Sequence, residues 1–222
     1  MANAATATYS GRSIFTNRLK GNGTEPRNIG WGDSANTGSA NSDVNLFKPQ
    51  TEARVAGTST LATTTQLADT YQVVGTVTCA VGAKTITEVG LFDTTTASPN
   101  TTVAVSQTAS ATVLSIGSVS GFPTSGNFYV QVEKEVELVT GANATSLTVS
   151  RGALGSTSAT HVSGSPVTLG GDGGAGTGGA TSGQTATVAA SSGGNMFIHA
   201  DFAGIALSVN DSIAFTLTDQ LT

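Results

Sequence analysis

Charged side chains are scarce in this sequence of 222 residues. Asp, Glu, Lys and Arg make up 10% of it, against about 25% in ordinary globular domains. Aromatic residues contribute only 5%, and Thr, Ser, Gly and Asn replace the missing charge. Thr and Val favour pleated strands, whereas Gly, Asn and Ser favour turns. This composition is typical of β-rich proteins and is uncommon in cytosolic enzymes.

Cysteine, long apolar runs and basic clusters are also lacking. Cys79 is the only cysteine, so no intrachain disulfide can form, and its Val-rich surroundings favour a small buried side chain. No apolar stretch reaches the roughly 18 residues of a membrane-spanning helix, and the start MANAATATYSGR does not have the pattern of a secretion signal. The net charge is −5 and no basic stripe is present. We therefore expect neither a membrane nor a nucleic-acid partner.

Residues 1–60 contain few apolar side chains and many turn-forming residues. We predict an extended N-terminal arm there, with at most a short helix near Ser13–Lys20, and disorder is the alternative. Isolated large apolar side chains on an arm need another surface to bury them. Phe15, Trp31 and Phe47 are therefore the predicted partner contacts. A core position in this same domain is an equally good interpretation of Trp31.

Alternating apolar residues predict strands on both sides of the middle of the sequence. Tyr71–Val81 and Lys84–Asp93 are separated by a short turn at Gly82, which favours a hairpin. Asn195–Phe202 and Asp211–Thr218 alternate in the same way. These four strands would form one antiparallel sheet or half of a sandwich. We assign residues 61–102 and 185–222 to one host β-domain.

Residues 103–169 carry a separate set of alternating segments. The predicted strands are Thr112–Val119, Asn127–Thr140, Ser146–Ser150 and Ser165–Leu169. We interpret the region as a small β-module inserted into the host domain, with the Gly-rich residues 170–184 as the return linker. The predicted fold class is therefore all-β: an antiparallel sandwich or barrel-like host domain, an inserted β-module and an extended N-terminal arm.

Catalytic and cofactor motifs lack the context that their chemistry needs. Gly174, Gly176 and Gly179 match a dinucleotide-binding spacing, but no helix-forming sequence follows to receive the phosphates. His161 and His199 are far apart, neither has a metal-ligand spacing, and a solvated or locally bonded side chain is the simpler interpretation of His199. No serine lies in a nucleophile elbow. We therefore predict no enzyme activity, no catalytic residue and no cofactor.

Glu133, Glu135 and Glu137 would lie on one face of the strand predicted over Asn127–Thr140. Three carboxylates this close repel each other, so the row could gather Ca²⁺ or a basic partner surface. A solvated strand face is the favoured alternative, and no metal site is assigned.

Several segments resemble structural proteins of tailed-phage particles. KTITEVGLFDTTT and NMFIHADFAGIALSVNDSIAFTLTD, together with Val55–Thr60 and Asp69–Thr78, resemble hairpin pairs of small virion proteins. Gly121–Gly126, Phe128–Val136 and Arg151–Val167 resemble a β-module that recurs in phage head and tail proteins.

The resemblance implies a virion structural protein that assembles in the host cytoplasm. It suggests a capsid decoration (cement) protein, a homotrimer that stabilises the shell by bridging subunits of the major capsid protein. The alternative is a tail fibre, neck or baseplate accessory protein whose inserted module adheres to the host surface.

Overall fold

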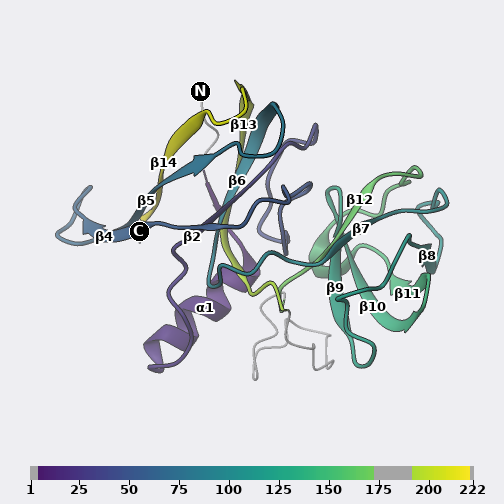
Figure 1. The fold of residues 1–222 in the computed structure, drawn as a ribbon. Coiled ribbons are helices and arrows are strands. Elements are labelled where there is room, and N and C mark those ends of the chain that lie inside the picture. Colours follow the sequence, from purple (N-terminus) through teal and green to yellow (C-terminus); the bar gives the residue numbers. More distant parts are fainter. Residues whose placement is uncertain (1–4, 173–191, 221–222) are drawn as a thin grey trace.

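The computed structural model describes residues 5–172 and 192–220, which form antiparallel strands and one α-helix (Figure 1). The all-β prediction is confirmed. In chain order the elements are β1 (Thr6–Ala7), α1 (Tyr9–Leu19), β2 (Asn28–Gly32), β3 (Val55–Ala56), β4 (Thr58–Ala62), β5 (Thr70–Thr78), β6 (Lys84–Phe92), β7 (Asn100–Thr102), β8 (Val113–Ser115), β9 (Phe128–Val132), β10 (Glu135–Asn143), β11 (Ser146–Ser150), a 3₁₀ turn (Ala153–Gly155), β12 (Pro166–Leu169), β13 (Met196–Leu207) and β14 (Ser212–Gln220).

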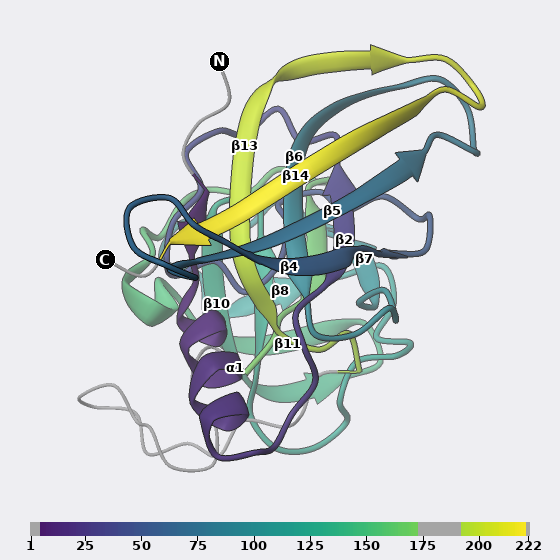
Figure 2. The same ribbon diagram turned by 90° about the vertical axis from the view of Figure 1, so that its left-hand side faces the viewer.

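The host domain has two sheets that share one core. One sheet has the strand order β1-β13-β6-β2-β3 and the other β14-β5-β4, and Figure 2 shows the second sheet lying across the first. Val73 and Val77 of β5 pack in the same core cluster as Ile86 and Leu91 of β6. In β5, Val73 and Val77 are buried, whereas Val74, Thr76 and Thr78 are exposed, as the alternation predicts.

The predicted hairpin of β5 with β6 is wrong. β5 pairs with β14 and β4, whereas β6 pairs with β13 and β2, so the chain changes sheet at the turn around Gly82. Val73 and Val77 give β5 an apolar face, and Val89 and Leu91 give β6 an apolar face toward the same core. Placing the strands in different sheets lets these faces pack against each other across the core, which a flat hairpin would not do.

The prediction of an extended N-terminal arm is also wrong for the described residues. β2 is an inner strand between β6 and β3, and all five of its residues are buried. Helix α1, which begins earlier than predicted, packs against β13. Gly30 allows the close approach of β2 to its neighbours, because a Cβ there would lie 2.9 Å from the Phe92 ring. The few apolar residues of this region complete the core of the host domain.

Residues 100–169 form a sheet and a core of their own. The strand order is β7-β12-β9-β10-β11-β8, and a bridge between Val103 and Ile116 joins the two ends of the sheet into a small barrel. The barrel interior is apolar and includes Phe128, Val130 and Leu147. The single strand predicted over Asn127–Thr140 is instead the hairpin of β9 and β10.

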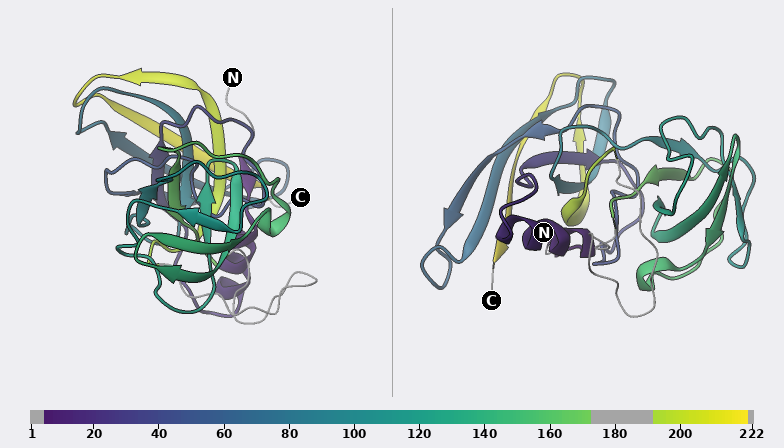
Figure 3. Two further views of the ribbon diagram at one scale, coloured as in Figure 1. Left: turned by 90° about the vertical axis from the view of Figure 1, so that its right-hand side faces the viewer. Right: turned by 90° about the horizontal axis from the view of Figure 1, so that it is seen from below.

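Residues 42–47 connect the barrel to the host domain. Val44 packs with Tyr129 and Val136 of the barrel, and its N–H donates to the side-chain oxygen of Gln131 at 3.0 Å. Two positions later, Leu46 packs with Phe92 and Met196 of the host domain. The barrel therefore stands beside the host domain with a packed junction (Figure 3). Of the predicted linker, Gly170–Asp172 continue this junction, and residues 173–184 lie outside the described residues.

Candidate interaction surface and buried charge clusters

An open apolar groove of about 700 Å³ lies between α1 and the ends of β4, β5 and β14. We call it the α1 groove. Its apolar lining includes Ile14, Phe15, Pro26, Leu61, Tyr71 and Phe197. Phe15 is 44% exposed and Leu61 is 72% exposed. Large apolar side chains gathered in one exposed hollow are typical of an interaction site.

The sequence of α1 fixes this helix against β13 and leaves Phe15 facing the groove. Thr8 caps the helix by accepting a hydrogen bond of 2.9 Å from the N–H of Gly11. Gly11 itself lies against the backbone of Phe197, where a Cβ would collide with the carbonyl oxygen. This close approach buries Gly11 and Ile14. Phe15 then lies at the groove with part of its ring exposed.

Charged residues line the rim of the α1 groove. Arg12 and Arg18 come from α1, and Glu25 and Asp219 lie among the other lining residues. Within the described ranges, neither arginine forms an ion pair: Arg12 lies over the Tyr9 ring and Arg18 donates to the carbonyl of Gly23. These guanidinium groups are available to carboxylates of a partner.

The three predicted contact residues are not brought together. Phe15 lies in the α1 groove, whereas Trp31 is 3% exposed and Phe47 is fully buried. Trp31 belongs to the core of the host domain, and the ring of Phe47 packs edge-on against His199 with 4.7 Å between the ring centroids. The partner-contact prediction is therefore wrong for Trp31 and Phe47 in this folded chain, because its own core covers them.

His199 lies in a buried cluster with Asp43 and Glu88. Of the two interpretations of this residue, the solvated one is wrong; the side chain is hydrogen-bonded, but to residues far away in the sequence and not to local ones. Its Nδ1 lies 2.8 Å from Asp43 and its Nε2 lies 3.0 Å from Glu88. Burial alone would lower the pKa of His199, but the hydrogen bonds and charges of the two carboxylates outweigh it and raise the pKa to about 9. Glu88 also accepts from the N–H groups of Phe47 and Lys48. The cluster ties the segment after β2 to β6 and β13.

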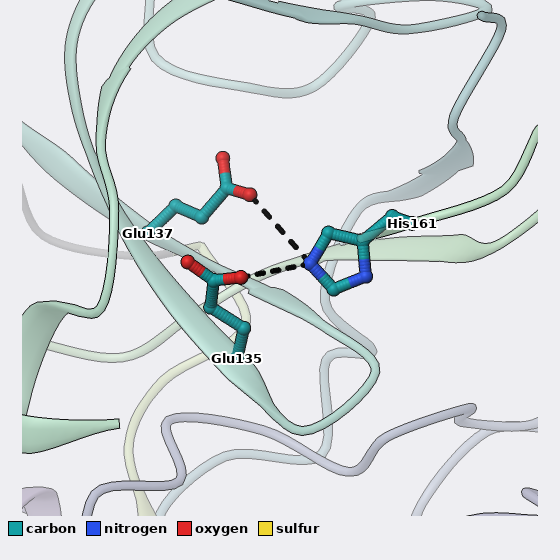
Figure 4. Close-up of side chains that lie close together, drawn as sticks. All are labelled: Glu135, Glu137 and His161. Carbon is teal, nitrogen blue, oxygen red and sulfur yellow. Dashed lines mark hydrogen bonds and ion pairs between the residues drawn. The ribbon is translucent and has the colours of Figure 1, made fainter. Parts of the chain in front are cut away.

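Glu135 and Glu137 face the apolar interior of the barrel, against the prediction of a solvated face. The turn between β9 and β10 places Glu135 opposite Val132 and Glu137 opposite Val130. Residues that are directly opposite in an antiparallel pair share a face of the sheet. The two side chains are 1% and 0% exposed, and Figure 4 shows both carboxylates near His161.

Glu135 is fully bonded in this cluster. Arg151 donates to it from Nε at 2.8 Å and from Nη2 at 2.6 Å, and His161 Nε2 lies 2.9 Å away. The N–H groups of Gly152 and Ala159 donate to it as well. Burial alone would raise the pKa of Glu135, but the bonds from His161 and Arg151 outweigh it and lower the pKa to about 2.

Glu137 has a different environment from Glu135. Arg151 Nε lies 3.1 Å from one of its oxygens, yet neither oxygen has a hydrogen bond of good geometry among the described residues. Burial is the main cause that raises the pKa of Glu137, to about 7. The two neighbouring carboxylates therefore differ in protonation near neutral pH.

Glu135, Glu137 and His161 bring ligand atoms within 4.8 Å of one another, as a metal site would. However, Arg151 already provides a cation at 2.6 Å from Glu135. A metal ion would also need a free lone pair on His161, whose two nitrogens lie 2.7 Å from Glu133 and 2.9 Å from Glu135. The geometry favours an ion-pair network over a metal centre.

No protein-family model matches the chain, and no curated protein matches it significantly. In the described part of the chain, no helix has the length and apolar character required to cross a membrane. The candidate sites therefore rest on the geometry given above.

Proposed function

We propose that this chain is a non-enzymatic structural protein of a tailed-phage virion, specifically a capsid decoration protein that stabilises the shell by bridging major capsid subunits. The observation that carries the proposal is the α1 groove, an exposed apolar hollow with two arginines at its rim that form no ion pair among the described residues. The proposal also draws on the resemblance of Lys84–Thr96 and Asn195–Asp219 to small virion proteins. A homo-oligomer located in the virion follows from the same resemblance.

A groove of this kind suits a segment of a capsid subunit better than a small substrate. Burial of the partner's apolar side chains contributes about 25 cal/mol per Å² removed from water, before the costs of association. Arg12 and Arg18 would pair with acidic residues that flank the apolar segment. Many copies bound in this way would hold neighbouring capsomers together.

The environment of the histidines supports a structural role over a catalytic one. Each histidine has both ring nitrogens bonded to carboxylates, so neither nitrogen is free to remove a proton from a substrate. Both histidines are also buried at 1% exposure or less. The two histidines and their carboxylate partners therefore stabilise the fold, although such groups would ordinarily suggest catalysis.

Binding to capsid shells that lack the protein tests the groove. We expect the double variant Phe15→Ala/Leu61→Ala to co-sediment with such shells at least tenfold more weakly than the wild type, since central apolar contacts carry most interface energy. Leu67→Ala is the matched control, because Leu67 is 90% exposed and lies outside the groove. Circular dichroism checks that all variants are folded.

Unchanged shell binding of the folded double variant would contradict the role of the groove. Binding of the wild type to purified tails, but not to shells, would place the protein in the tail, neck or baseplate instead. In that case the barrel would be the first part to test for adhesion to the host surface.

A further inference from the structure

β14 presents a long free edge. It pairs with β5 along its whole length, from Ser212 opposite Thr78 to Gln220 opposite Thr70, without a bulge. On its other side no described strand pairs with it, because the sheet order is β14-β5-β4. Figure 2 shows β14 at the border of this sheet, running from the β13–β14 turn toward the C-terminus.

The ladder with β5 determines which backbone groups face the free edge. The N–H of Cys79 donates to the carbonyl of Asp211 just before β14, so this pair belongs to the hydrogen-bonded positions. Hydrogen-bonded and non-hydrogen-bonded pairs alternate along an antiparallel ladder. The N–H and C=O groups of every second residue therefore point away from β5. These residues are Ser212, Ala214, Thr216, Thr218 and Gln220.

This edge lacks the features that normally protect an edge strand. β14 contains no proline, lysine or arginine, and Asp219 is its one charged residue. Ile213, Phe215 and Leu217 alternate along it, so the strand is regular in side chains as well as in backbone. Natural proteins block such edges with charges, prolines or bulges unless another strand covers them.

We infer that the β14 edge pairs with the β14 edge of a second copy of this chain. An antiparallel two-fold contact centred on Thr216 places Ala214 opposite Thr218 of the partner subunit and Phe215 opposite Leu217 of the partner subunit. All five outward-facing residues then find a partner, which gives about ten backbone hydrogen bonds. Asp219 and the equivalent carboxylate lie at opposite ends of the contact and do not repel each other.

The free edge of β4 offers a poorer match. β4 has five residues, and its pairing with β5 leaves only Ser59 and Leu61 with outward-facing backbone groups. Pairing of β14 with β4 of another copy would form about four hydrogen bonds. The two-fold contact through β14 therefore provides hydrogen-bond partners for more of the outward-facing backbone groups of β14. This inference does not depend on the virion assignment.

Light scattering coupled to size exclusion tests the contact. We expect the wild type to have twice the 22.0 kDa mass of the single chain. Thr216→Pro removes one outward N–H without affecting the ladder to β5, and it should weaken dimerisation at least 100-fold. Thr216→Ala is the matched control, because it keeps the N–H and should remain a dimer.

Oxidative cross-linking gives a second measurement that does not depend on the stability of a proline variant. Thr216→Cys should form an intersubunit disulfide, because the two copies of this residue face each other at the two-fold axis. Thr218→Cys should not, because its equivalent lies about four residues away along the paired strand. A wild type that stays monomeric, or an oligomer in which Thr216→Pro changes nothing and Thr216→Cys does not cross-link, would overturn the inference. A threefold particle would also overturn it, because a two-fold contact through β14 cannot close a ring of three copies; that result would fit the trimer that the resemblance implies.

Discussion

Replacing either of two neighbouring glutamates in the barrel by glutamine should change stability in opposite directions. Glu135 and Glu137 lie on the same face of β10, two residues apart, and both are buried. Glu135 has five bonds to positive or N–H groups, whereas neither oxygen of Glu137 has a hydrogen bond among the described residues and burial raises its pKa to about 7. The substitution removes the same charge at both sites, so each variant is the matched control for the other.

The pKa shifts give the expected magnitudes, at about 1.4 kcal/mol per pH unit. The pKa of Glu137 is raised from 4.5 in the unfolded chain to about 7 in the folded protein. The free energy of unfolding is therefore highest at low pH and falls by about 3 kcal/mol as the pH rises from 4.5 through 7. Glu137→Gln should remove this cost and raise the free energy of unfolding near pH 8 by about 1–3 kcal/mol. Near pH 5 the gain should fall below about 1 kcal/mol.

Glu135 has the reverse linkage. Its pKa is lowered from 4.5 to about 2, so its contribution to stability is present above pH 4.5 and is lost as the pH falls through 2. Glu135→Gln should lower the free energy of unfolding by about 3–5 kcal/mol at both pH 8 and pH 5, since Arg151 and His161 lose their charged partner. Urea denaturation followed by circular dichroism measures both variants. Equal effects of the two substitutions at pH 8 would refute this account of the cluster.

Two further predictions concern the host domain and its junction with the barrel. His199→Gln should lower the free energy of unfolding near pH 6.5 by about 3 kcal/mol. The difference from the wild type should shrink as the pH rises through 9, where the imidazolium loses its proton. A difference in the free energy of unfolding that stays constant between about pH 6 and 10 in urea titrations would contradict the raised pKa. Val44→Asp should uncouple the barrel from the host domain, because it places a charge in the cluster with Tyr129 and Val136. Calorimetry should then show two unfolding transitions in the variant, whereas Val44→Ile should unfold like the wild type.

The alternation of apolar residues was sufficient to predict the strands but not their faces or partners. In β5, Val73 and Val77 are buried and Val74, Thr76 and Thr78 are exposed, as expected. Between β9 and β10, the apolar alternation continues through a turn at Glu133 and Lys134 that has no glycine, and Glu133 adopts a positive φ of 52°. A two-residue turn reverses which positions share a face, so Glu135 and Glu137 turn inward. No local sequence signal marks this turn.

The sequence pattern also did not predict the contacts between residues that are far apart in the chain. His199 alternates with the apolar residues of β13, which predicts an outward position, but residues from the region after β2 cover that face. Trp31 and Phe47 looked isolated because their partners lie far along the chain, in β6 and β13. Charged residues in otherwise apolar strands, such as Glu88 and His199, were the only hint that they pair.

The number of copies per particle tests the proposed function most directly. Quantitative mass spectrometry of purified virions measures this protein against the major capsid protein. A decoration protein predicts a copy number comparable to that of the capsid protein. A handful of copies per particle, or none, would contradict a role in stabilising the shell.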